Sequence, residues 1–184
     1  MKVHEAITGR LREFIERQPM FFVASAPNGP DGHVNVSPKG MGGTFAVLGE
    51  HRVAYLDYHG SGSETKAHLD ENGRITVMFC AFEGPPNIVR LHGTGRVVPR
   101  TDPAFAELLA LFPGSPDKNG ARSVVDIEVH RVSDSCGYSV PLMAYQGDRD
   151  LLIRAHERRD EAALVDYRRI KNRTSIDGMP AFQD

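Results

Sequence analysis

Residues 52–82 read Arg52-Val-Ala-Tyr-Leu-Asp-Tyr58, His59-Gly-Ser-Gly-Ser63, Glu64-Thr-Lys-Ala-His-Leu-Asp-Glu71, Asn72-Gly73 and Arg74-Ile-Thr-Val-Met-Phe-Cys-Ala-Phe82. The first and last segments are apolar on both faces, which is typical of strands buried on two sides. The spacing of Ser61 and Glu64 predicts a capping box and a helix that begins near Gly62. Asn72-Gly73 tolerates the left-handed conformation of a C-cap and ends that helix. The region therefore predicts strand, turn, helix and strand in succession.

The turn between the first strand and the helix also has the composition of an anion site. Ser61, Ser63 and Thr65 place three hydroxyl groups beside the free N–H groups of a helix start, and Lys66 adds a cation one turn into the helix. Such a helix start suits a phosphate group. Capping alone explains the same residues, because capping boxes are common. The spacing leaves both interpretations open.

The remaining chain predicts more strands and a few helices. Before residue 52, we expect an amphipathic helix over Val3–Gln18 and strands over Met20–Ala26, His33–Ser37 and Thr44–Leu48. After residue 82, we expect a strand over Asn87–Val98, a helix over Asp102–Phe112, a strand over Arg122–Val132, an irregular segment over Ser133–Gln146 and a charged helix over Asp148–Arg169. Strands in hairpin order with few helices favour an antiparallel barrel with attached helices.

Two features of these strands suggest a ligand or a backbone irregularity. Asn35, Ser37 and Lys39 share one face of their strand by the period of two, and Pro38 favours an edge position because it cannot donate a ladder hydrogen bond. Solvent exposure is the commoner explanation for such a polar face. Gly93 and Gly95 predict a bulge, a barrel corner or a ligand close to the backbone.

The composition describes an ordinary globular protein. The chain has 184 residues, 40% hydrophobic and 25% charged, with a formal net charge of −2. This length predicts a single domain, and the charge gives no reason to expect nucleic acid or an anionic membrane as a partner. The sequence contains no apolar run of membrane-spanning length and no secretory signal, so we expect a cytoplasmic protein. Cys80 and Cys136 are too far apart in the sequence to form a metal-ligand or redox pair.

Four segments, in this order, resemble the FMN-binding split barrel of the pyridoxamine 5′-phosphate oxidase-like family. They are His33-Val-Asn-Val-Ser-Pro-Lys-Gly40, Val53-Ala-Tyr-Leu-Asp-Tyr58, Gly60-Ser-Gly-Ser-Glu-Thr-Lys-Ala-His-Leu69 and Glu71-Asn-Gly-Arg-Ile-Thr-Val-Met-Phe79. The resemblance covers about residues 5–135. It implies a mostly β, α+β fold: a six-stranded antiparallel split β-barrel that forms a homodimer with FMN at the interface. Residues 1–184 would then form one domain, with 135–184 as a C-terminal helical extension.

The resemblance also implies where the cofactor binds. The strand Asn35-Val-Ser-Pro-Lys39 would line the isoalloxazine ring, and the turn and helix start at Ser61–Lys66 would hold the phosphate. The expected cofactor-binding residues are Asn35, Val36, Ser37, Lys39, Tyr58, Ser61, Ser63, Thr65 and Lys66. The polar strand face and the anion site thus become two parts of one site.

The chain departs from true pyridoxamine phosphate oxidases in its basic residues. Those enzymes carry an arginine on the strand that here has Asn35, and another beside the helix lysine, where Thr65 stands. Their C-terminal substrate segment is rich in Trp, Arg and His, whereas this chain has no Trp. Pyridoxine phosphate is therefore not the expected substrate, and the missing bidentate guanidinium groups reduce the expected affinity for phosphate.

The expected function is that of an FMN-dependent oxidoreductase with an unassigned small-molecule substrate. The alternatives are a non-catalytic flavin or haem binder on the same fold and a reductase that uses the deazaflavin F420. No side chain is assigned as a catalytic acid or base. No metal site is expected, because the eight histidines show no ligand spacing such as His-x-x-x-His.

Overall fold

The computed structural model describes residues 1–117 and 119–183, and most of its secondary structure lies in one antiparallel sheet. The strands are β1 (Lys2–His4), β2 (Met20–Ser25), β3 (Asn35–Gly40), β4 (Phe45–Gly49), β5 (Arg52–Tyr58), β6 (Arg74–Cys80), β7 (Ile88–Pro99) and β8 (Ala121–Ser135). The helices are α1 (Gly9–Arg17), α2 (Glu64–Asn72), α3 (Phe105–Leu109), α4 (Leu151–Glu157) and α5 (Glu161–Lys171).

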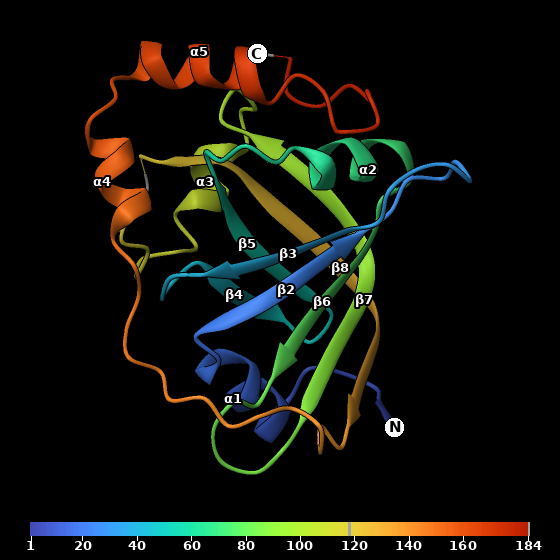
Figure 1. The fold of residues 1–184 in the computed structure, drawn as a ribbon. Coiled ribbons are helices and arrows are strands. Elements are labelled where there is room, and N and C mark those ends of the chain that lie inside the picture. Colours follow the sequence, from blue (N-terminus) through green and yellow to red (C-terminus); the bar gives the residue numbers. More distant parts are fainter. Residues whose placement is uncertain (118, 184) are drawn as a thin grey trace.

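The sheet is strongly curved, and its hydrogen-bonded order is β3-β2-β6-β7-β8-β5-β4, with β1 paired to β8 alone. This order makes an antiparallel half-barrel with a few helices around it (Figure 1). The expected mostly β, antiparallel fold with a few helices is therefore confirmed, but the expected count of six strands is wrong, since eight strands pair within the described residues. β3 is an edge strand, as Pro38 predicts, and it continues through this proline to Gly40.

Strand β5 separates two apolar clusters, because its side chains alternate between the two faces of the sheet. Val53 and Tyr55 point into the main core, whereas Ala54 and Leu56 join a second cluster with Phe105 and other residues of the α3 region. Helix α3 thus covers the outer face of β5. The apolar outer face of this strand consequently gives no reason to expect a second subunit there.

The N-terminal segment differs from the prediction of one helix over Val3–Gln18. Residues 2–4 pair with the far end of β8, in the register Lys2↔Asp134, and α1 begins only at Gly9. The partner strand β5 pairs with β8 no further than Glu128. The end of β8 therefore has a free side that β1 fills.

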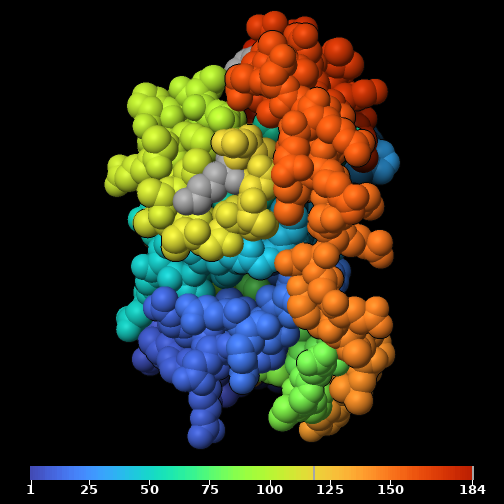
Figure 2. Space-filling view, turned by 90° about the vertical axis from the view of Figure 1, so that its left-hand side faces the viewer, coloured from blue at the N-terminus to red at the C-terminus, as the bar shows by residue number. Residues whose placement is uncertain are grey.

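The C-terminal region also differs from the prediction. β8 extends to Ser135, and the charged segment forms α4 and α5 instead of one helix. The break has a local cause: the Asp160 side chain accepts a hydrogen bond from the N–H of Ala163 at 2.8 Å and so caps a new helix. These residues lie along one side of the molecule in Figure 2, coloured orange to red. None of the helices in the described ranges is long and apolar enough to cross a membrane.

Gly93 lies at an irregular point of the β7–β8 pairing, where the register shifts between His92 and Gly93. A Cβ atom at Gly93 would lie 2.1 Å from the carbonyl oxygen of Glu128. We expect Gly93→Ala to lower the free energy of unfolding by about 1–3 kcal/mol, as overpacking does. Gly49→Ala is the control, because a Cβ there meets no atom within 4 Å. Equal urea denaturation midpoints for the two variants would contradict this explanation.

Candidate anion cavity and adjoining groove

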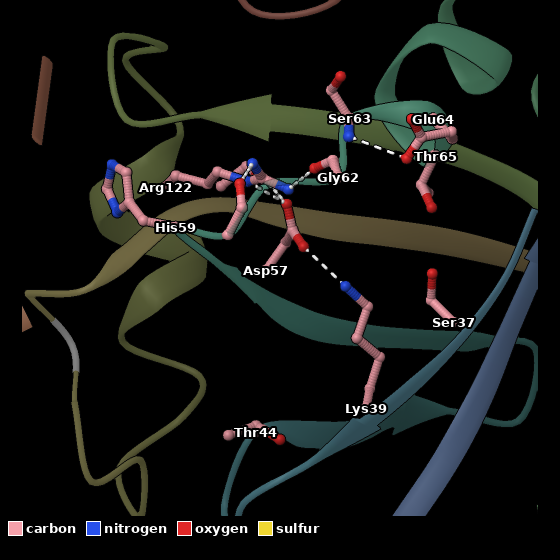
Figure 3. Close-up of polar contacts among 12 residues, drawn as sticks. Ser37, Lys39, Thr44, Asp57, His59, Gly62, Ser63, Glu64, Thr65 and Arg122 are labelled. Atoms are coloured by element: carbon pink, nitrogen blue, oxygen red, sulfur yellow. Dashed lines mark hydrogen bonds and ion pairs between the residues drawn. The ribbon is translucent and has the colours of Figure 1, made fainter. Parts of the chain in front are cut away.

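A buried carboxylate, Asp57, organises the candidate site. It lies near the end of β5, where Lys39 Nζ of β3 is 3.0 Å from Oδ1 and Arg122 Nε of β8 is 2.7 Å from Oδ2. Figure 3 shows the two cations approaching this carboxylate from two sides. Burial alone would raise the pKa of the Asp57 carboxyl, but the charges of Arg122 and Lys39 outweigh this effect and hold the pKa far below its ordinary value.

Arg122 connects this ion pair to the turn before α2. Its Nη1 donates to the carbonyl of Gly60 at 3.1 Å, and its Nη2 donates to the carbonyl of Gly62 at 2.6 Å. The turn is therefore fixed by a side chain that is itself fixed by Asp57. The fold thus determines the direction in which the first N–H groups of α2 point.

Helix α2 begins at Glu64, two residues later than the predicted capping box requires. Ser63 is its N-cap and makes no side-chain capping hydrogen bond, while the Glu64 carboxylate accepts from the Ser63 N–H at 3.1 Å. The capping box between Ser61 and Glu64 is therefore wrong, whereas the predicted C-cap is confirmed by Gly73 in the left-handed region (φ 71°). The first intrahelical bond runs from Ala67 N to Ser63 O. The N–H groups of the preceding turn consequently have no acceptor within the helix.

A chain of hydrogen bonds fixes the polar face of β3. Ser37 Oγ donates to Asn35 Oδ1 at 2.9 Å, and Asn35 Nδ2 donates to Thr65 Oγ1 at 3.1 Å and to Ser25 Oγ at 3.4 Å. Ser25 Oγ in turn lies 3.0 Å from Nδ1 of the fully buried His68. Thr65 Oγ1 therefore acts as an acceptor toward β3.

These elements enclose a cavity of about 220 Å³ at the start of α2. Among the charged side chains that line it are three cations, Lys39, Lys66 and Arg122, and two carboxylates, Asp57 and Glu64. The lining therefore carries a formal excess of one positive charge. Lys66 also pairs with Asp70 one turn along the helix. The remaining lining residues are Asn35, Ser37, Pro38, Tyr58, Gly60, Gly62, Ser63, Thr65, Val97 and Val125.

The structure brings together seven of the nine residues predicted for the cofactor site. Asn35, Ser37, Lys39, Tyr58, Ser63, Thr65 and Lys66 all line the cavity. Val36 points to the opposite face of β3 and is 61% exposed. Ser61 is exposed and lies outside the cavity lining.

Sequence reasoning missed Asp57, Glu64 and Arg122. Asp57 gives a local signal, since it is a charged residue within a strand that is otherwise apolar on both faces. Charged residues are almost never fully buried without a partner. That partner is Arg122, 65 residues further along the chain, and only the β5–β8 register identifies it.

A larger groove of about 660 Å³ adjoins the cavity and shares Pro38, Lys39, Tyr58 and Gly60 with it. Its walls are mostly apolar, and one side is formed by the C-terminal segment through Tyr145, Gly147, Asp148, Arg149, Leu151 and Leu152. Asp148 Oδ2 accepts a hydrogen bond from Gly42 N at 2.8 Å and attaches this segment to the glycine-rich turn after β3. Met41 also lines the groove and adopts a left-handed conformation with φ 72°, which is uncommon for a residue other than glycine.

The neighbouring His59 is buried and neutral. Its Nδ1 lies 2.8 Å from the carbonyl oxygen of Gly120, and its Nε2 lies 2.7 Å from Arg168 Nη1. A guanidinium can only donate, so Nε2 accepts and Nδ1 carries the proton. Burial, reinforced by the charge of Arg168, lowers the pKa of His59 to about 4. Within the described residues, no group of three or more His, Cys, Asp and Glu side chains is arranged to hold a metal ion.

Comparisons with known proteins place the chain in a family. The sequence model of the pyridoxamine 5′-phosphate oxidase family matches residues 7–136. The pyridoxamine 5′-phosphate oxidase family protein ustO of Aspergillus flavus is 47% identical over 141 residues, which cover 76% of this chain and 56% of that protein. The chain thus spans little more than half the length of this curated relative.

Solved structures with low sequence identity share the fold. A tagged variant of HupZ from Group A Streptococcus gives a TM-score of 0.56 at 19% identity, over 70% of this chain and 99% of that chain. A pyridoxamine 5′-phosphate oxidase-related, FMN binding protein of Nostoc punctiforme gives a TM-score of 0.50 at 11% identity, over 70% of this chain and 82% of that chain. At these identities the likeness concerns the fold alone.

The neutral state of His59 predicts how stability depends on pH. Its folded pKa of about 4 lies below the ordinary value of 6.5, so the unfolded chain binds the additional proton between these values. The free energy of unfolding should therefore fall as the pH decreases from 6.5 to about 4, by at most about 1.4 kcal/mol per pH unit for one proton. Asp57 loses its contribution at lower pH, since its folded pKa lies far below the ordinary carboxyl value. Urea denaturation of wild type and His59→Phe at several pH values measures the slope, and an unchanged slope in the variant would contradict the assignment.

Proposed function

Because the chain belongs to the pyridoxamine 5′-phosphate oxidase family, we propose that it is an FMN-dependent oxidoreductase. The observation that carries this proposal is a cavity lined by polar groups with excess positive charge that adjoins a mostly apolar groove. FMN has the matching division, with a phosphate at one end and a largely apolar ring system at the other.

The phosphate fits the cavity at the start of α2. Lys39 and Arg122 share the single carboxylate of Asp57, so their combined charge is only half neutralised. The Thr65 hydroxyl lines the cavity, and the N–H groups of the first turn of α2 lack helical acceptors. Charge-assisted hydrogen bonds from such groups favour a phosphate dianion. In this arrangement Asn35 does not contact the phosphate as the arginine of true pyridoxamine phosphate oxidases does. It holds the side chain of Thr65, which lines the phosphate cavity.

The isoalloxazine ring fits the groove beyond Lys39. The groove and the cavity meet at residues of β3 and β5, so one molecule can extend through both. Apolar walls such as Met20 and Leu56 exclude water from a ring placed there, and Lys39 stands at the junction. When bound, the flavin supplies the electron chemistry, while the protein supplies orientation and hydrogen bonds.

We propose a small-molecule substrate, and the residues of the cofactor site do not specify its chemical class. The alternative functions are a flavin carrier without catalytic activity and a protein that binds F420 or haem in place of FMN. The absorption spectrum of the purified protein distinguishes flavin, deazaflavin and haem. Reduction of the bound cofactor by NADH or NADPH in steady-state assays distinguishes an enzyme from a carrier.

We expect Lys66→Met to weaken FMN binding about tenfold or more, because a charge-assisted contact contributes about 1.5–3 kcal/mol. Methionine keeps the apolar stem and removes only the charge. Fluorescence titration with FMN and with riboflavin, which lacks the phosphate, measures the effect, and riboflavin affinity should not change. Ser61→Ala locates the phosphate, since this hydroxyl is exposed outside the cavity lining. An equal loss in Ser61→Ala would place the phosphate on the outer side of the turn.

We also propose a homodimer, which buries the outer face of β3, β2 and β6. Along this face the register places Phe22 beside Pro38 and Met78, and Ala24 beside Val36. Val36 is 61% exposed, and among the described residues no helix lies over this outer face in Figure 1. A second copy related by a two-fold axis would cover this apolar face with the same face of its own.

We expect light scattering of the wild type to give about twice the chain mass of 20.3 kDa. Val36→Glu should shift the population toward the monomer, because it places a charge in the proposed interface while leaving the core unchanged. Circular dichroism checks that the variant is folded. A monomeric wild type with flavin bound would overturn the dimer and leave the cofactor proposal intact.

A further inference from the structure

The last residues of the chain fold back onto the start of α2. Residues 172–182 form a short loop closed by the hydrogen bonds Phe182 N to Asn172 O at 3.0 Å and Ala181 N to Arg173 O at 2.8 Å. In Figure 1 this loop, in red, lies next to α2. We call residues 172–182 the C-terminal clasp.

The C-terminal clasp contacts the turn before α2, which lines the anion cavity, and the connection between β2 and β3. Ser63 Oγ donates to the carbonyl of Thr174 at 2.8 Å, and Asn172 Nδ2 donates to the carbonyl of Gly60 at 2.7 Å. Asp177 accepts from the backbone N–H of His33 at 2.9 Å, in the loop between β2 and β3. The clasp therefore joins the turn before α2 to the β2–β3 connection.

Phe182 is the apolar anchor of the clasp. Its side chain is 1% exposed and belongs to the main core cluster. The Arg122 guanidinium carbon lies 4.7 Å from the centre of its ring, and Lys66 Nζ lies 6.0 Å from it. Both distances are within the range of a cation–π interaction. Phe182 thus packs against two of the three cations of the cavity. It is not itself one of the residues that line the cavity or the groove.

We propose that Phe182 is a positioning residue that makes the site selective for a phosphorylated ligand over its unphosphorylated counterpart. This inference rests on the proposed function and assigns the C-terminal clasp a part in that site. Phe182 holds the guanidinium that fixes Gly60 and Gly62 and keeps water from one face of the cations. A cation with fewer water contacts attracts a phosphate more strongly, because the local dielectric constant is lower. Phe182 does not line the groove proposed for the isoalloxazine ring, so this contact should not change the affinity for the ring.

The test compares two ligands in three variants of the full chain. Phe182→Leu removes the aromatic ring, whereas Phe182→Tyr keeps an aromatic ring at this position. Ile176→Ala is the matched control, because this clasp side chain is 71% exposed and only its backbone N–H contacts Glu64. We expect Phe182→Leu to weaken FMN binding about five- to tenfold with riboflavin unchanged, and Phe182→Tyr to restore most of the affinity for FMN. Ile176→Ala should leave both affinities at the wild-type values.

An equal loss of FMN and riboflavin affinity in Phe182→Leu would overturn the inference, because it would indicate a general structural role. Should Phe182→Leu fail to fold, Phe182→Met preserves the side-chain volume and serves in its place. If the wild type binds neither flavin, the proposed cofactor is wrong, and thermal stabilisation by pyrophosphate then tests the anion cavity alone. Equal stabilisation of wild type and Phe182→Leu by pyrophosphate would again overturn the role of Phe182.

Discussion

The ion pair between Asp57 and Arg122 is the constraint on which the site depends. A charge buried inside an apolar strand is costly unless it is paired and hydrogen-bonded. Asp57 meets this requirement with two cations and the Ser123 hydroxyl, which lies 3.3 Å from Oδ2. The same requirement fixes Lys39 on β3 and the turn before α2. A single carboxylate therefore couples an edge strand, a central strand and a helix start, and leaves a surplus of positive charge where they meet.

The central region of the fold could be predicted from the sequence because its signals are local. A few neighbouring residues suffice to predict the apolar strands β5 and β6, the Ser/Gly turn between β5 and α2, and the end of α2 at Asn72-Gly73. The structure confirms each of these elements. The predictions for the two ends of the chain were wrong because the structure there depends on contacts that local patterns do not contain. β1 forms because β8 has a free side at its far end, and the break between α4 and α5 depends on one capping carboxylate. Helical periodicity contains neither piece of information.

The same distinction applies to the site. Asn35, Ser37 and Lys39 share a face through the period of a strand, and Thr65 with Lys66 marks a helix start, so these residues were accessible to pattern reasoning. Other residues that build or support the cavity come from distant segments. Arg122 is 65 residues from Asp57, and Thr174 is 111 residues from Ser63. Such pairs follow only from sheet register and from the path of the C-terminal segment.

The two ends of the site are built by different physical means. The anion cavity is fixed by buried charges and by hydrogen bonds in which most donors and acceptors have a partner, which makes it rigid and demanding of its ligand. The groove is formed by apolar side chains, by Met41 in a left-handed conformation and by the segment 145–152 of the C-terminal extension. Strained residues and irregular segments persist where function, and not packing, determines the structure. Under the proposed function, affinity for the phosphate and choice of substrate would therefore depend on separate parts of the chain. Under the proposed function, substitutions at Met41 or Leu152 would change the choice of substrate, while Asp57, Arg122 and the C-terminal clasp would continue to hold the cofactor.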